Sequence, residues 1–321
     1  MSKPALSACD GEFVMLPKAE LILDAQNSVG ESPVWHVDEQ ALYWVDILAR
    51  QLCCWDAKSA QSSRWEAPEM LACIASLGVT GGWIAGMETG MFALKPQVDG
   101  KLHTELWAPV SHAMLGMRFN DGRCDRQGRF LAGTMLMNMA AAAPVGHVYR
   151  YDSEGPLVSL LSGLITPNGM GFSPDGRTMY LSDSHPSVQL IWAFDYDIAT
   201  GTPSNKRVFV DMNPLPGRPD GAAVDADGCY WICGNDAGLV HRFTPRGKLD
   251  YSLTVPVKKP AMCAFGGPGL DTLFVTSIRP DGVDLSDQPL AGGLFALRPG
   301  VRGLAETPHA NKFEIPSAGQ G

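Results

Sequence analysis

The sequence predicts an all-β fold, a six-bladed β-propeller with four antiparallel strands in each blade. A short segment that begins with an aromatic residue recurs along the chain, and successive copies start between 40 and 51 residues apart. A turn signal lies just before each copy, and another short apolar segment lies before each turn. A period in this range, with short strands in every unit, is typical of propeller blades. The six copies are YWVD at 43, WIAG at 83, FLAG at 130, YLSD at 180, WICG at 231 and FVTS at 274.

The composition agrees with many short strands joined by tight turns. The chain of 321 residues contains 35 Gly and 24 Pro, and only 18% of its residues are charged. Two stacked β-sandwich domains are the alternative, but nothing resembling a linker divides the chain and the repeat continues through its middle. We therefore expect a flexible N-terminal extension over residues 1–19 and a single propeller domain over residues 20–321.

Charge and cysteine content exclude several classes of partner. The net charge is -9 and the longest basic run is Lys258-Lys259, which argues against a nucleic-acid surface. The eight Cys residues form no Cys-x-x-Cys pair and three lie in apolar strand-like runs, a pattern typical of reduced thiols rather than of a zinc cluster. We expect a cytoplasmic protein, a monomer or small homo-oligomer, that acts on a small molecule.

No segment reads as a membrane span or a secretory signal. Residues 70–87 carry no charge, but four glycines interrupt them, so we expect two buried strands around a Gly-Gly turn. Residues 1–16 lack an apolar core and contain Asp10 and Glu12, which makes a secretory signal a poor interpretation. The sequence therefore predicts no membrane association.

Two Asp-Gly pairs, seven residues apart in RPDGAAVDADGCYWICG (218–234), occupy different positions in the repeat. Asp227 lies four residues before Trp231, as Asp175 lies five before Tyr180, so both are expected in the turn between the first and second strands of a blade. Asp220 lies eleven residues before Trp231, where the chain enters the inner strand at the mouth of the central channel. We predict that Asp220 belongs to a site and that Asp175 and Asp227 are turn residues.

Other repeats carry polar residues in nearly the same position as Asp220. Glu31, Arg118 and Asn168 each lie twelve residues before the aromatic residue of their repeat. The remaining two repeats offer Leu71 and Cys263. Each polar residue alone fits a turn or a loop, but the shared register predicts that four blades bring them to one channel mouth.

The residue types indicate a cation site and a hydrolytic reaction. Glu31, Asn168 and Asp220 provide two carboxylates and an amide oxygen, hard donors that suit Ca²⁺, Mg²⁺ or Mn²⁺, and Zn²⁺ less well. A divalent cation held by three groups keeps open positions for a substrate carbonyl and a water. Arg118 and Asn120 lie two apart on a strand, so both are expected to face the channel as substrate hydrogen-bonding groups.

Five segments closely resemble the senescence marker protein, regucalcin and gluconolactonase family, and the resemblance covers roughly residues 20–300. The segments are GESPVW (30–35), RFNDGRCDRQGRFLAGTM (118–135), PNGMGFSPDGRTMYLSDS (167–184), FDYD (194–197) and RPDGAAVDADGCYWICG (218–234). The resemblance implies a six-bladed propeller that hydrolyses sugar lactones with one divalent metal ion. It implies metal binding by the residues matching Glu31, Asn168 and Asp220, lactone contacts by Arg118 and Asn120, and a general base at Asp220.

One position departs from the family pattern. Where that pattern has an acidic residue that reaches the sugar, this chain has Asn138 at or near the matching position, within the apolar segment MLMNMAAAAPVG (135–146). The segment fits a loop that prefers a less hydroxylated lactone, or a lid that packs on itself. His185 is either a pocket residue or a loop residue, and both interpretations stay open.

Three functions are compatible with this reading. A metal-dependent lactonase ranks first, a calcium-binding regulatory propeller without turnover second, and a protein-interaction propeller last. The last would not need convergent carboxylates, and the fold alone does not decide function.

Overall fold

The structure is a computed structural model that describes residues 6–9, 12–15, 17–78, 82–153 and 155–310. Part of the expected extension over residues 1–19 and part of the expected Gly-Gly turn lie outside the described residues. A two-stranded hairpin pairs β1 (Leu6–Cys9) with β2 (Glu12–Met15) within that extension. No helix in the described part of the chain is long and apolar enough to cross a membrane.

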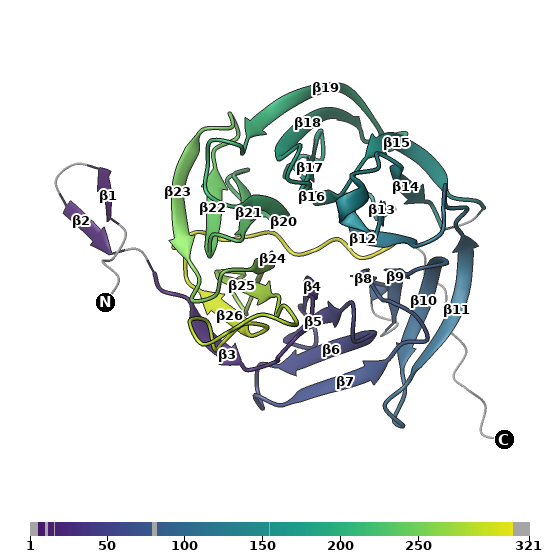
Figure 1. Ribbon diagram of the computed structural model, residues 1–321, viewed down its shortest axis with the longest axis horizontal. Coiled ribbons are helices and arrows are strands. Elements are labelled where there is room, and N and C mark those ends of the chain that lie inside the picture. Colours follow the sequence, from purple (N-terminus) through teal and green to yellow (C-terminus); the bar gives the residue numbers. More distant parts are fainter. Residues whose placement is uncertain (1–5, 10–11, 16, 79–81, 154, 311–321) are drawn as a thin grey trace.

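Six four-stranded antiparallel sheets form a ring of blades around a central axis (Figure 1), so the predicted six-bladed propeller is confirmed. The inner strands are β4 (Gly30–His36), β8 (Cys73–Ser76), β12 (Met117–Cys124), β16 (Pro167–Phe172), β20 (Arg218–Val224) and β24 (Pro260–Gly266). The second strands are β5 (Ala41–Asp46), β9 (Trp83–Gly86), β13 (Phe130–Leu136), β17 (Thr178–Asp183), β21 (Tyr230–Asn235) and β25 (Thr272–Ser277).

The third and fourth strands complete each blade toward the outside of the ring. The third strands are β6 (Gln51–Asp56), β10 (Gly90–Pro96), β14 (Gly146–Tyr151), β18 (Leu190–Asp197), β22 (Leu239–Phe243) and β26 (Leu294–Leu297). The outer strands are β7 (Ser62–Glu66), β11 (Leu102–Pro109), β15 (Val158–Leu164), β19 (Thr202–Asp211), β23 (Leu249–Thr254) and, in the last blade, β3 (Glu20–Leu23). Because β3 comes from the N-terminal end of the chain, it closes the ring against β26, where Leu23 pairs with Leu294.

The recurring aromatic residues form the apolar layer between blades. All six lie on second strands and none is more than 9% exposed. Tyr43 and Trp83, from neighbouring blades, have ring centroids 4.5 Å apart, and Trp35 stacks on Phe274 at 5.5 Å across the junction of the first and last blades. The sequence period is therefore the period of inter-blade packing, to which the buried aromatic rings contribute.

The turns between first and second strands hold the acidic residues predicted to be structural. Asp175 accepts hydrogen bonds from Ser173 Oγ at 2.6 Å and from the backbone N–H of Arg177 at 3.1 Å, between β16 and β17. Asp227 lies between β20 and β21, and its side chain is 69% exposed. Both assignments are confirmed, and both turns lie at the end of the channel away from the starts of the inner strands.

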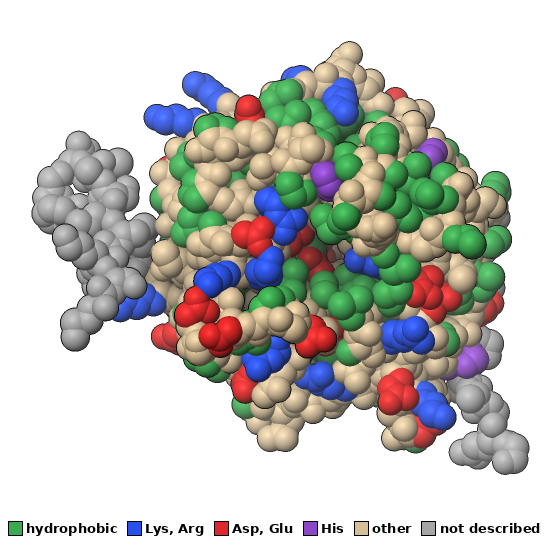
Figure 2. Space-filling model, viewed as in Figure 1, with side chains coloured by type: hydrophobic (Ala, Val, Ile, Leu, Met, Phe, Trp, Pro, Cys, Tyr) green, Lys and Arg blue, Asp and Glu red, His purple; other side chains and the backbone are tan. Residues whose placement is uncertain are grey.

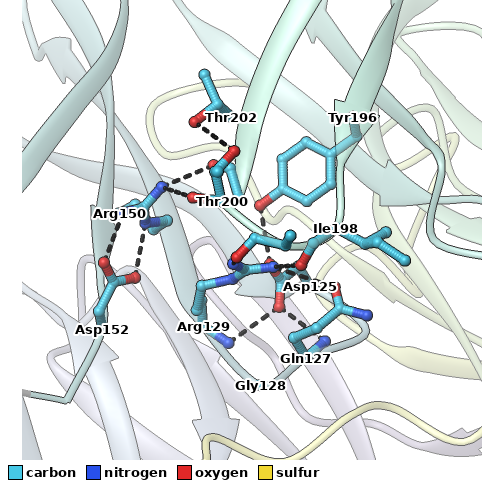
Figure 3. Close-up of polar contacts among 12 residues, drawn as sticks. Asp125, Gln127, Gly128, Arg129, Arg150, Asp152, Tyr196, Ile198, Thr200 and Thr202 are labelled. Atoms are coloured by element: carbon cyan, nitrogen blue, oxygen red, sulfur yellow. Dashed lines mark hydrogen bonds and ion pairs between the residues drawn. The ribbon is translucent and has the colours of Figure 1, made fainter.

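A neighbouring turn ties two blades together through Asp125 (Figure 3). Its buried Oδ2 accepts from Arg129 Nε at 2.6 Å and from the Tyr196 hydroxyl at 2.8 Å, and Tyr196 belongs to the next blade. Arg129 also donates to the Ile198 carbonyl at 2.7 Å, while Arg150 donates to the Thr200 carbonyl at 2.7 Å. These charge-assisted bonds fix blade against blade on the face that carries the turns.

Residues 302–310 form a strap across the turn-side face of the ring (Figure 1, yellow). At one end the backbone N–H of Ala226 donates a hydrogen bond to the Arg302 carbonyl. At the other end the backbone N–H of His309 donates a hydrogen bond to the Ser76 carbonyl at 2.7 Å. Between them, Glu306 Oε1 lies 3.5 Å from Nη1 of the buried Arg123. A cavity of about 10 Å³, which is room for roughly one water, lies between the strap and the inner strands. The strap therefore blocks this end of the channel.

We predict that Glu306→Gln destabilises the fold by about 1–3 kcal/mol, because the guanidinium of Arg123 then lacks a charged partner from the strap. The measurement is the free energy of unfolding in urea. Asp195→Asn is the matched control, since it removes an exposed ion pair with Arg207 whose side chains are 49% and 54% exposed, and it should change stability little. Equal losses in the two variants would contradict a bracing role for the strap.

Candidate active site at the open mouth of the channel

Five of the six inner strands carry a β-bulge near their first residues. A bulge breaks the ladder and turns side chains in a new direction, and bulges are common next to active sites. The ladder of β8 with β9 shows no such shift. This is also the blade in which the apolar Leu71 occupies the position that carries a polar residue in four other blades. The register shifts lie between Glu31 and Val34, Phe119 and Gly122, Asn168 and Gly171, Pro219 and Ala222, and Pro260 and Cys263.

The three candidate metal ligands lie at or directly beside the bulges of their inner strands. Glu31 and Asn168 are the last paired residues before their bulges, opposite Val45 and Ser182. Asp220 lies inside its bulge, directly after the paired Pro219. Its spacing to the aromatic residue is one residue shorter because the turn is shorter: Phe172 pairs with Met179 in the fourth blade, whereas Val224 pairs with Tyr230 in the fifth. In the first blade the chain turns through a left-handed residue at Ser32, with φ 48°, and in the fourth through Gly169, with φ 60°. A Cβ at 169 would approach the Tyr230 hydroxyl oxygen to 2.5 Å, so this close approach requires glycine.

A chain of hydrogen bonds joins predicted site residues from two blades. Arg118 Nη1 donates to Asn120 Oδ1 at 2.8 Å, and Asn120 Nδ2 donates to Asn168 Oδ1 at 3.0 Å. Asn168 Nδ2 then donates to Ser184 Oγ at 2.6 Å. The structure thus brings Arg118, Asn120 and Asn168 into direct contact.

The same chain reaches the blade of Asp220. Ser184 Oγ donates to the Pro219 carbonyl at 2.6 Å, next to Asp220. Asn235 Nδ2 donates to Asp220 Oδ2 at 2.6 Å, while Oδ1 of Asp220 makes no hydrogen bond with any described residue. One oxygen of this carboxylate is therefore held in place and the other remains available.

The two carboxylates repel each other in a buried setting. Burial raises the pKa of Asp220 to about 7, although Arg218 and the Asn235 hydrogen bond oppose the shift. The pKa of Glu31 is raised well above its usual value, first by burial and then by the charges of Asp220 and Asp121. Both residues are 8% exposed. The site thus concentrates negative charge that a cation would compensate.

The donor set fits a divalent cation. Glu31 and Asp220 supply carboxylate oxygens, and the Asn168 amide oxygen, which accepts one hydrogen bond, can take a second partner. Among residues that the structure describes, no group of three or more His, Cys, Asp and Glu side chains is arranged to hold a metal. A cation at this mouth would therefore need the Asn168 oxygen as well as the carboxylates.

Sequence reasoning missed Asp121, Ser184 and Asn235. Asp121 follows Asn120 on β12 and is buried there, where its Oδ2 accepts a hydrogen bond from the backbone N–H of Met170 at 2.8 Å. Burial raises its pKa as well. Ser184 and Asn235 lie at or just after the ends of second strands, which meet the inner strands at this face. In the sequence, Ser184 and Asn235 are the polar residues at the ends of the apolar segments YLSDS and WICGN, and this position could have indicated that they lie at the mouth.

The loop beyond β13 contains Asn138 and is held by His185. Asn138 is exposed before the short helix η2 (Met139–Ala141), and it makes no side-chain hydrogen bond with the other described site residues. His185 is buried, and its Nε2 lies 3.1 Å from the Met139 carbonyl while Nδ1 lies 2.7 Å from Ser187 Oγ. His185 therefore anchors the loop at the mouth, whose hollow and charged wall are visible in Figure 2.

The chain belongs to the SMP-30/gluconolactonase/LRE-like family, whose model matches residues 29–279. It is 39% identical over 280 residues to a 6-deoxy-6-sulfogluconolactonase of Pseudomonas putida, covering 87% of this chain and 94% of that relative. It is 34% identical over 303 residues to regucalcin of Xenopus laevis, covering 91% and 98%. A solved structure of regucalcin from Agrobacterium tumefaciens, described as a calcium-binding protein, matches with a TM-score of 0.84 at 27% identity, covering 91% of this chain and 97% of that one.

Proposed function

We propose that this protein is a divalent-metal-dependent lactonase that hydrolyses a sugar lactone to the free aldonic acid. The observation that carries the proposal is the pair of buried, mutually repelling carboxylates, Glu31 and Asp220, beside the Arg118–Asn120–Asn168 chain at the open mouth of the channel. Membership of a family that includes a gluconolactonase-type relative supports the same chemistry.

A cation held by Glu31, Asn168 and Asp220 would polarise the lactone carbonyl and lower the pKa of a water. Asp220 would take the proton from that water through Oδ1, the oxygen that Asn235 leaves available. A cation bound beside this carboxylate would favour its ionised form, which is the form that accepts a proton. Asn235 keeps the carboxylate in the orientation that this step requires.

Arg118 and Asn120 would orient the lactone. Nη1 of Arg118 is engaged by the Phe119 carbonyl at 2.7 Å and by Asn120, whereas Nη2 makes no hydrogen bond with a described residue. Nη2 can donate to a ring or hydroxyl oxygen of the substrate. Burial lowers the pKa of Arg118 to about 10, so the group is still charged at neutral pH.

The substrate preference is expected to follow the loop that contains Asn138. Its first residue, Met137, is 42% exposed, and residues 140–143 are alanines. An uncharged, apolar loop offers few partners for sugar hydroxyls, which supports a less hydroxylated lactone. A calcium-binding regulatory propeller without turnover is the second candidate, and release of acid from a panel of aldonolactones with and without chelator distinguishes the two.

We predict that Asp220→Asn weakens cation binding and lowers kcat by at least 100-fold, and that saturating cation does not restore turnover, because the amide keeps an oxygen donor but cannot act as a base. The measurements are acid release and cation affinity by calorimetry. Asp227→Asn is the matched control from the same stretch, and it should leave both nearly unchanged because Asn-Gly forms the same turn. Full turnover of Asp220→Asn at saturating cation would leave Asp220 as a ligand only.

We predict that Arg118→Ala raises KM for the lactone by about 10- to 100-fold, because a charged hydrogen bond is worth about 1.5–3 kcal/mol. Cation affinity should stay within about threefold of the wild-type value. Steady-state kinetics and calorimetry on the same preparation test both statements. A parallel loss of cation affinity would indicate that Arg118 acts through Asn120 and Asn168 on the metal site instead.

We predict that replacing residues 137–143 with a polar loop of equal length changes the ranking of lactones by kcat/KM more than it changes Tm. The reason is that this loop borders the mouth and its residues are mostly exposed, so little packing is lost. Val208→Ser, at an exposed position on outer strand β19, is the control for the effect of added polarity. An unchanged ranking would contradict a role in substrate choice.

A further inference from the structure

A second cavity, of about 690 Å³, opens beside the site. Connecting segments of the first, fifth and sixth blades line it, and Asn235 is part of its wall. Because Asn235 also donates to Asp220, the cavity directly adjoins the proposed catalytic carboxylate. A molecule whose carbonyl lies at the mouth can extend into this space.

Three cationic side chains line the cavity, in a protein whose net charge is -9. Arg218 Nε lies 2.6 Å from Asp236 Oδ2, and Lys259 Nζ pairs with the other oxygen of the same carboxylate. Arg279 has no carboxylate partner among the described residues, and its Nη1 donates only to the Ala291 carbonyl at 3.3 Å. Asp281 is the acidic residue among those that line the cavity, whereas three of the lining residues are cationic. Basic side chains beside the central hollow are visible in Figure 2.

The backbone holds these cations in fixed positions. Arg218 opens β20, Lys259 lies directly before β24, and Arg279 follows β25. The Ile278 N–H donates to the Lys259 carbonyl at 3.0 Å, and the Arg279 N–H donates to the Asn27 carbonyl at 3.0 Å. Guanidinium and ammonium groups on such well-held backbone can donate hydrogen bonds to the oxygens of a tetrahedral or planar anion.

The opposite side of the mouth differs in character. A cavity of about 550 Å³ between the second and third blades is lined by Met114, Leu115 and Met137, with Glu88 as its charged residue. Leu115 is 96% exposed. An anion would be repelled there and attracted at the other side, so the charge distribution sets the direction in which an anionic substrate lies.

We propose that the cavity lined by Arg218, Lys259 and Arg279 binds a terminal anionic group of the lactone, a sulfonate, phosphate or carboxylate at the end remote from the reacting carbonyl. This inference rests on the proposed lactonase function and specifies its substrate class. Arg279, the cation without a carboxylate partner in the described structure, is the principal contact.

The test compares four lactones of the same six-carbon acid, with a hydroxyl, sulfonate, phosphate or carboxylate at C6. We expect at least one anionic lactone to exceed the hydroxyl compound in kcat/KM by about 10-fold or more. Arg279→Met should lower the ratio of anionic to neutral kcat/KM by about 10- to 100-fold, through KM. Added salt should raise KM for the anionic lactone alone, because screening weakens charge attraction.

Two further measurements keep the proposal testable if Arg279→Met folds poorly. Lys259→Met should lower the same ratio, and inorganic phosphate or sulfate should inhibit the wild-type protein competitively against the anionic lactone. Arg207→Met, on the outer strand β19, is the matched control and should leave the ratio unchanged. The anionic lactone with the highest kcat/KM relative to the hydroxyl compound identifies the anionic group that the cavity prefers.

Three outcomes would overturn the proposal. One is a neutral lactone hydrolysed as well as every anionic one, and another is an Arg279→Met variant that loses both activities equally. Both leave the lactonase function intact, because the wild-type protein still hydrolyses the hydroxyl compound. Hydrolysis of none of the four lactones, nor of any less hydroxylated aldonolactone, with any divalent cation would instead refute the proposed function together with this subsite.

Discussion

Pairing of β3 with β26 is the interaction on which the arrangement of the site depends. It places a strand from the start of the chain in the last sheet, so that Leu21 and Leu23 face Phe295 and Leu294 across the ladder. Glu31 follows β3 by only a few residues and enters the first inner strand, whereas Asp220 and Arg279 come from the fifth and sixth blades. Without this closure the ends of the chain would be free to separate, and the first blade would not be held beside the last. Ring closure therefore fixes the distance between groups that lie far apart in sequence.

The closed ring is also asymmetric along its axis. On one face, buried Asp125 and the strap around Glu306 satisfy the cations Arg129 and Arg123, so charge there is balanced within the protein. On the other face, bulges interrupt the inner strands, and Glu31 and Asp220 remain buried with raised pKa values. Buried charge without a partner is costly, and such sites are more often functional than structural. The contrast between the two ends supports assigning the chemistry to the open mouth.

Charges around this mouth form an ordered pattern. Acidic oxygens lie at the centre, Arg118 lies buried beside them, and the cations Lys259 and Arg279 line an adjoining cavity, while Leu115 marks an apolar rim across the opening. A lactone with an anionic group at one end would bind in a single orientation, because one side of the mouth is cationic and the other is apolar. Catalysis and orientation would then depend on different blades, which allows loops such as residues 137–143 to vary without disturbing the carboxylates.

The repeat of aromatic segments was sufficient to predict the six blades, because a strand order that recurs every 40 to 51 residues buries its aromatic residue at the same position in each unit. It also separated Asp220 from Asp175 and Asp227, since distance from the aromatic residue sets whether an aspartate lies on the inner strand or in the turn. The local sequence around Glu31, Asn168, Arg118 and Asn120 likewise placed them on inner strands. These conclusions depend on short-range geometry, which the sequence by itself determines.

Contacts between distant segments were decided only by the tertiary structure. The hydrogen bond from Met170 of the next blade to Asp121, and the one from Asn235 to Asp220, have no local signal in the sequence. Nothing in the sequence indicates that Glu306 crosses the ring to Arg123, or that Arg279 borders the same cavity as Arg218. Such contacts depend on how one blade is rotated and displaced against another, which many side chains determine together. A local pattern does not contain that information.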